Sequence, residues 1–319
     1  MESTGVSMMA NVARNRMGAM LVCGAGMIAI GAGEAWGQQA ANEGSEPGFD
    51  WSFSAHTRYD FRSDLEGTNN GEYAVWRSGF DTSLRFPIAD TARLKLGLGY
   101  EYNNYDFDQP NSFLATPAAE PFSDIHILNL SAVGEFQVDE EWSWYAGGGV
   151  RMAGESGADT GDMTTFSGRG GVGYRFSDSL EMTFGAVVST QIEDDVLILP
   201  AITAMWNINE RWDLRVTGPG AELSYAIDDE TWIGLAGRWE NRRFRLEDDV
   251  LGLGSVIEET AIPVYLHLRR AAGNGLSLDL SAGAIVGREF DIEDRDGRNG
   301  TTVDGDAGFF ASVGFRYDF

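Results

Sequence analysis

Arginine is the residue type whose placement in this sequence is most suggestive of chemistry. Lys95 is the only lysine, so nearly all of the 23 basic residues are arginines, whose planar guanidinium groups pair bidentately with carboxylates. Many of them occupy every second position of alternating segments, opposite the apolar residues. We therefore expect one charged inner face that collects Arg58, Arg77, Arg85, Arg93, Lys95, Glu101, Arg151, Arg169, Arg175, Glu181, Arg238 and Asp279.

This charged face has two interpretations. If it surrounds an open path, its rings of charged side chains would set a preference among ions or solutes. If the interior is filled, the same residues would form a network of salt bridges, because buried charges must be paired and hydrogen-bonded. The residues alone leave both interpretations open, since they define the width of the interior only through the number of strands.

The three histidines raise the question of a lipid hydrolase, which needs a histidine and a serine nucleophile within hydrogen-bond reach. His126 is expected to face outward near one rim, but Leu128 stands where a serine on the same strand face would be needed. His56 and His267 are expected to point inward, where a lone histidine is more often a structural hydrogen-bonding group. We therefore expect no catalytic residues and no enzyme activity.

Acidic segments could bind a metal ion, because clustered carboxylates together with Gly and Asn can hold calcium. Their spacing does not match the calcium-loop pattern, however, and solvated acidic loops are common. We therefore expect no metal site and no cofactor. The acidic residues concerned are Glu247, Asp248 and Asp249 in one segment, and Asp291, Glu293, Asp294, Asp296, Asp304 and Asp306 in another.

Strict alternation of apolar and polar residues begins at Phe49 and continues to Arg62, which falls on the same polar face as Arg58. A period of two sustained over about 12 residues matches a tilted, membrane-spanning strand. Similar segments recur along the chain, tight turns alternate with longer acidic loops, and aromatic residues cluster at the strand ends. We expect an all-β fold, a single transmembrane antiparallel β-barrel of about 14 strands, with about 12 as the alternative.

The element Gly218-Pro219-Gly220 interrupts a short alternating run that begins at Trp212, and the apolar phase shifts after it. It is either a tight hairpin between two strands or a bulge within one strand. The hairpin keeps the later long loops on the same side of the barrel as the earlier ones, so counting strands favours it.

The N-terminal residues have the order of a secretory signal peptide. Arg14 and Arg16 precede the apolar stretch 17–33, and Ala35-Trp36-Gly37 has the small-x-small pattern of a cleavage site. We expect residues 1–37 to be a signal peptide, 38–48 a short periplasmic segment and 49–319 the barrel, located in a bacterial outer membrane. An uncleaved membrane anchor is the alternative for the first segment.

The formal net charge is −26, with 49 acidic residues, so the chain should repel nucleic acid. The expected partners are instead outer-membrane lipid, small solutes and the barrel-assembly machinery. This last partner is implied by the final segment, where Phe315, Tyr317 and Phe319 share one face. A terminal strand that ends in an aromatic residue, with another two positions earlier, resembles the signal by which that machinery recognises its clients.

The stretch 199–246 resembles a family of uncharacterised bacterial outer-membrane barrels. The resemblance implies the barrel architecture and brings no activity. More loosely, the whole chain is similar to outer-membrane transporters of small hydrophobic compounds. The residues that carry the family resemblance are Pro200, Trp206, Leu214, Gly218, Pro219, Gly220, Tyr225, Arg243, Phe244 and Arg245.

These observations together predict a passive, porin-like channel for small solutes with an Arg-rich lumen. The main alternative is a closed structural or adhesive barrel that acts through its acidic extracellular loops, and an outer-membrane lipid hydrolase is a third hypothesis. The first two differ in one observable property, which is whether the folded barrel conducts.

Overall fold

The computed structural model describes residues 49–66, 71–108, 121–247, 255–294 and 300–319. The expected signal peptide (1–37) and the segment 38–48 lie outside these residues, so this division of the chain stays a prediction.

Each regular element in the described residues is a β-strand, as the alternating pattern predicts. The strands are β1 (Asp50–Leu65), β2 (Gly71–Ala89), β3 (Ala92–Asp108), β4 (Asp124–Gln137), β5 (Trp142–Glu155), β6 (Thr164–Ser177), β7 (Leu180–Gln191), β8 (Asp194–Asn207), β9 (Trp212–Thr217), β10 (Gly220–Ala226), β11 (Thr231–Arg238), β12 (Glu240–Arg245), β13 (Val256–Gly273), β14 (Leu276–Glu293), β15 (Thr301–Gly305) and β16 (Gly308–Asp318).

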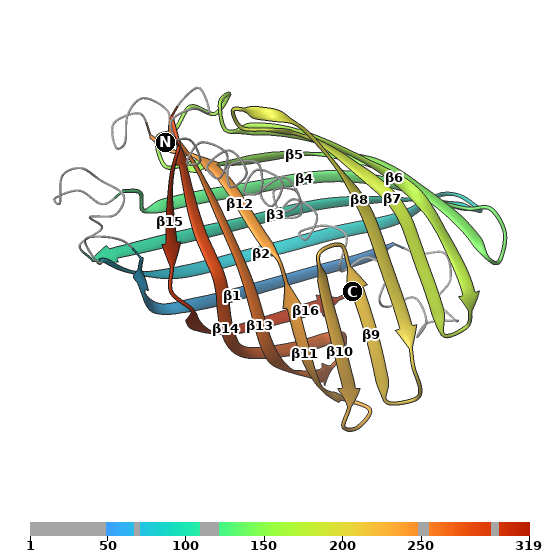
Figure 1. The fold of residues 1–319 in the computed structure, drawn as a ribbon. Coiled ribbons are helices and arrows are strands. Elements are labelled where there is room, and N and C mark those ends of the chain that lie inside the picture. The colour runs from blue at the N-terminus through green and yellow to red at the C-terminus, as the bar shows by residue number, and fades with distance from the viewer. Residues whose placement is uncertain (1–48, 67–70, 109–120, 248–254, 295–299) are drawn as a thin grey trace, which may run out of the picture.

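These strands form one sheet that closes into a barrel, because β1 pairs with β16 over residues 52–60 (Figure 1). The strands β11 and β12 follow one another along β13, and β15 and β16 follow one another along β14. The sixteen strands therefore make an antiparallel wall of 14. The expected all-β barrel of about 14 strands is confirmed, and the alternative of about 12 is excluded.

The two ends of the barrel differ in their connections. One end of the barrel carries the tight turns β2–β3, β6–β7 and β13–β14 and is here named the turn end. Strand β1 begins and strand β16 finishes at this turn end. The opposite end is here named the loop end. The expected alternation of tight turns with longer loops fails at two places on the loop end, since only Ile192 and Glu193 separate β7 from β8, and only Gly218 and Pro219 separate β9 from β10.

The outer face of the wall is apolar. Side chains that point away from the interior include many exposed aliphatic and aromatic residues, as expected for a surface in contact with hydrocarbon. Within the part of the chain that the structure describes, no helix is long and apolar enough to cross a membrane. Exposed outward side chains include Trp51, Trp76, Leu96, Leu130, Trp144, Phe184, Ile198, Trp206, Leu235, Leu266, Leu280 and Val313.

Gly218 and Pro219 form a two-residue hairpin between β9 and β10, with Thr217 paired to Gly220. The hairpin interpretation is thus confirmed. Gly218 has a positive φ of 55°, the conformation that tight hairpins require at their first central position and that glycine adopts without steric cost.

Replacing Gly218 with valine is expected to lower the free energy of unfolding by about 1–3 kcal/mol, because a β-branched residue is strained at positive φ. Urea unfolding of the refolded barrel in lipid, followed by tryptophan fluorescence, measures the effect. Gly168→Ala is the matched control, since its added Cβ would meet no atom within 4 Å. Equal losses in the two variants would contradict the argument from φ.

The short hairpin interrupts the barrel wall at the loop end. Pairing of β8 with β9 covers only residues 203–207, so residues 194–202 have β7 as their one strand neighbour among the described residues. On the far side of the interruption, β12 leaves the line of β11 and meets β5 in a parallel bridge between Arg245 and Gly154. β11 therefore ends at Arg238 and β12 begins at Glu240, since β10 has no residue left to pair beyond Gly220.

Two bulges change which side chains point inward. The register of β1 shifts between Asp60 and Ser63, so Arg62 lies on the outer face and pairs with Glu72 and Asp106. The expectation that Arg62 shares the inner face of Arg58 is wrong, because the extra residue of a bulge reverses the alternation.

A second bulge lies in β14 at Gly287, which has a positive φ of 59°. Val286 points outward and is exposed, whereas Arg288, two residues later, points inward and is buried. In a regular strand these two residues would share a face. The bulge is therefore what directs the Arg288 guanidinium into the barrel.

A hydrophobic cluster fills the loop end of the interior. Its members come from strands on opposite sides of the barrel and from the segment before β4, so their side chains meet across the lumen. They are Leu65, Tyr73, Val75, Tyr105, Phe107, Phe122, Ile125, Ile127, Ala153, Phe244, Leu246, Ile257, Phe290, Ile292 and Val303.

Candidate functional site

A buried ion-pair network lies directly beneath the hydrophobic cluster. At its centre, Glu259 accepts hydrogen bonds from Arg77 Nη2 at 2.7 and 2.9 Å and from the Tyr105 hydroxyl at 2.5 Å. Arg288 Nε lies 3.2 Å from the same carboxylate. Asp60 completes this group, with Arg288 Nη2 at 2.5 Å and Arg77 Nε at 3.5 Å.

The network continues across the interior to β12. Arg58 donates to Asp60 at 2.6 Å and lies 3.1 Å from Glu240, whose carboxylate also pairs with Arg242 and Arg238 at 2.6 Å each. Arg242 in turn lies 3.4 Å from Glu101.

The loop end of the interior is thus filled by paired charges and by the apolar cluster. Each of these guanidinium groups has at least one carboxylate partner, as charges removed from water require. This part of the charged inner face matches the filled-interior interpretation.

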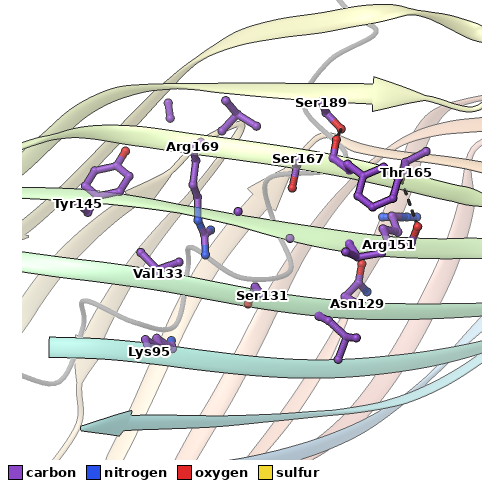
Figure 2. A pocket seen from close by; sticks show the side chains of 18 of the residues that line it. Lys95, Asn129, Ser131, Val133, Tyr145, Arg151, Thr165, Ser167, Arg169 and Ser189 are labelled. Carbon is purple, nitrogen blue, oxygen red and sulfur yellow. Dashed lines mark hydrogen bonds between the residues drawn. The ribbon is translucent and has the colours of Figure 1, made fainter. Parts of the chain in front are cut away.

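A cavity of about 120 Å³ lies elsewhere in the interior, against the inner faces of β3 to β8. Its lining follows rows of residues that lie opposite one another on neighbouring strands. One row holds Asn129, Arg151 and Thr165, the next Ser131, Ser167 and Ser189, and a third Lys95, Val133, Arg169 and Val187 (Figure 2). Gly218 of the short hairpin also lines the cavity. The cavity therefore lies next to the interruption of the wall.

Two guanidinium groups of the cavity differ from those of the network. Arg151 is 9% exposed, and neither its side chain nor that of Arg169 forms an ion pair or hydrogen bond with another described residue. One carboxylate, Glu135, is among the described lining residues, and it already pairs with Arg85. The lining therefore carries more positive than negative charge.

The structure places all twelve sequence-predicted inner residues on the inner face, in three settings. Arg58, Arg77, Glu101 and Arg238 belong to the network, and Lys95, Arg151 and Arg169 line the cavity beside the Arg85–Glu135 pair. The others lie toward the turn end. They are Arg93, Asp279, Arg175 and Glu181. Asp279 lies 3.5 Å from Arg269, and Arg175 lies 3.9 Å from Glu181. That any of them lines a permeation path stays a prediction.

Three important residues, Glu259, Arg242 and Glu135, are not among the sequence-predicted site residues. Glu259 lies in β13 on the same alternating face as His267. Arg242 and Glu135 also lie on alternating positions, so their inward orientation was visible in the pattern, but their partners were not.

Two of the histidines, His126 and His267, contact polar side chains of neighbouring strands. His126 faces outward and its Nδ1 is hydrogen-bonded with the Tyr100 hydroxyl at 2.8 Å. His267 is buried between Glu222 and Asp279, at 3.5 Å from each. These contacts assign no catalytic role to either residue.

Within the described ranges, no group of three or more His, Cys, Asp or Glu side chains could hold a metal ion. Asp248, Asp249 and Asp296 lie outside them. At the loop end, a hydrogen bond with Asp306, and the negative charges of Asp306 and Asp304, raise the pKa of Glu66.

The C-terminal aromatic residues lie along β16. Phe315 and Phe319 point outward and are exposed, and the Phe319 ring stacks on Trp51 with centroids 4.0 Å apart. This stacking joins the last strand to the first. Recognition of Phe315, Tyr317 and Phe319 by the assembly machinery stays a prediction.

The model of one protein family, described as DUF6268, a domain of unknown function, matches residues 137–318. The matched region includes the stretch 199–246 that carried the resemblance, and that resemblance is confirmed. No curated protein matches the chain.

Among solved structures, the chain is similar to the COG4313 outer membrane channel from Pseudomonas putida F1, at 10% identity and a TM-score of 0.47, covering 88% of this chain and 98% of that one. It is also similar to the Pseudomonas putida toluene transporter TodX, at 10% identity and a TM-score of 0.43, covering 93% and 98%. A third is the KdgM porin, at 9% identity and a TM-score of 0.33, covering 83% and 99%. Likeness at this level establishes neither an activity nor a substrate for this chain.

Proposed function

We propose that this chain, which belongs to the DUF6268 family of unknown function, is a passive outer-membrane channel for small solutes with an Arg-rich inner wall. The closed wall of 14 strands with an apolar outer face supports the membrane location. In that orientation the turn end is periplasmic and the loop end extracellular.

The observation that carries the proposal is the position of the cavity. The extracellular end of the interior is filled, but the cavity lies beside it, bounded by Ala201, Thr203 and Gly218 where the pairing of β8 with β9 stops. A solute path therefore has space inside the barrel and an interrupted wall next to that space. Lys95, Arg151 and Arg169 would set the preference for charge along this path.

A second candidate is the closed structural or adhesive barrel. The filled extracellular end favours it, because the apolar cluster and the ion-pair network leave no straight path along the barrel axis within the described residues. Conduction separates the two candidates.

The test is single-channel conductance in planar bilayers of the protein extracted from membranes of cells that express the full chain. We expect small, stable conductance steps. Arg169→Gln is expected to shift the ion preference toward cations, since it removes a positive charge from the cavity. Arg62→Gln is the matched control, because it removes an arginine from the outer face and should leave the preference unchanged.

A barrel that migrates as folded protein before heating, yet never conducts, would overturn the channel proposal in favour of the closed barrel. Equal shifts in the two variants would remove the cavity from the path.

A further inference from the structure

We propose that the cavity between Arg151 and Arg169 is a binding site for a small organic anion, a carboxylate with an apolar body. This inference rests on the proposed channel function, because it names the class of solute that the channel would select.

The charge of the ligand follows from the two guanidinium groups. Elsewhere in the interior the buried arginines Arg58, Arg77 and Arg288 are each matched by a carboxylate. Arg151 is buried and has no such partner among the described residues, although the chain has 49 acidic residues from which one could have been supplied. Because an unpaired buried charge is costly, an anion that enters the cavity would supply the missing partner.

The hydroxyl groups between the two arginines support a carboxylate. Ser131, Ser167 and Ser189 form the row that separates the row of Arg151 from that of Arg169 (Figure 2). Gly149 stands in the same row and Gly147 in the next, so no side chain of β5 occupies the space above them. A carboxylate has two oxygens and about four acceptor positions, which suits the guanidinium groups and the hydroxyls of Ser131 and Ser167. The Ser189 hydroxyl already donates to the Thr190 carbonyl at 2.9 Å.

The size and the apolar part of the ligand follow from the rest of the lining. Val133, Val187, Ala201 and the Tyr145 ring contribute apolar surface. The cavity measures about 120 Å³ and is not closed off, so an aromatic ring, which a closed cavity of roughly 150 Å³ can hold, would lie partly in it and partly in the adjoining space. Benzoate is therefore a suitable probe, and benzyl alcohol is its neutral counterpart of similar size.

The experiment is isothermal titration of benzoate into the full-length protein in detergent. We expect one benzoate per barrel and much weaker binding of benzyl alcohol. Arg151→Gln and Arg169→Gln should each weaken benzoate binding about 10- to 100-fold, as expected for loss of a hydrogen bond between charged groups. Arg151→Lys should bind with intermediate affinity, since it keeps the charge and loses the planar fork.

Arg175→Gln is the matched control, because Arg175 lies on the inner face of the same strand as Arg169 but outside the cavity lining. It should change the affinity by about twofold at most. The unfolding midpoint of Arg151→Gln should not fall, since no partner in the described residues loses its pair. A merely structural role of Arg151 predicts the opposite.

Three outcomes would overturn the proposal: equal binding of benzyl alcohol, displacement of benzoate by an equal concentration of chloride or phosphate, or unchanged affinity in both glutamine variants. Should one variant fail to fold, the other decides. Failure of the channel proposal has a different signature, since binding in detergent would persist in a barrel that does not conduct.

Discussion

Replacing Glu259 with glutamine is expected to lower the free energy of unfolding of the barrel by about 3–5 kcal/mol. Glu259 is fully buried and pairs with both Arg77 and Arg288. Glutamine keeps the shape of the side chain but removes its charge. Asp60 is then the one carboxylate near both guanidinium groups in the described structure, so a buried positive charge is left without compensation.

Urea unfolding in lipid measures this loss. The matched control is Glu72→Gln, which removes a carboxylate that is 48% exposed and lies 3.9 Å from Arg62. Exposed pairs of this kind contribute about 0–1 kcal/mol. If the two variants lose equal stability, the network does not hold the loop end together in the way proposed.

Replacing Phe244 with alanine is expected to lower the free energy of unfolding by about 3–5 kcal/mol and to raise the conductance of the barrel. Phe244 is 0% exposed, and its ring contacts Phe122 and Tyr105 at centroid distances of 5.6 and 6.1 Å. It holds β12 across the interior against the apolar cluster. Removing the ring leaves a cavity at the closed end and weakens that closure.

The stability loss is measured by urea unfolding and the conductance in planar bilayers. Phe184→Ala is the matched control, since this ring points outward, is 41% exposed and loses contact with lipid rather than with the cluster. It should cost clearly less stability and leave the conductance unchanged. An unaltered conductance in a destabilised Phe244→Ala barrel would show that the cluster supports the fold without closing a path.

The sequence by itself determined the architecture. Alternation with a period of two decides which side chains point inward, because successive residues of a strand face opposite sides of the sheet. The inward orientation of Arg58, Arg77 and Arg169, the outward orientation of His126 and the count of strands all follow from this local rule. The hairpin at Gly218 was also readable, since glycine followed by proline provides the dihedral angles that a tight turn needs.

Only the tertiary structure decided which inner arginines are neutralised. Arg77 and Arg169 look alike in the sequence, yet Arg77 meets Glu259, which is 182 residues away, whereas Arg169 faces a cavity. The bulge at Arg62 also escapes the pattern, because a single extra residue reverses the phase there without leaving a compositional trace, whereas the bulge at Gly287 is marked by an isolated glycine within a strand. Pairing across a closed barrel depends on the register of all the strands together. The local pattern therefore determines the direction of a side chain, and only the assembled fold determines what that side chain meets.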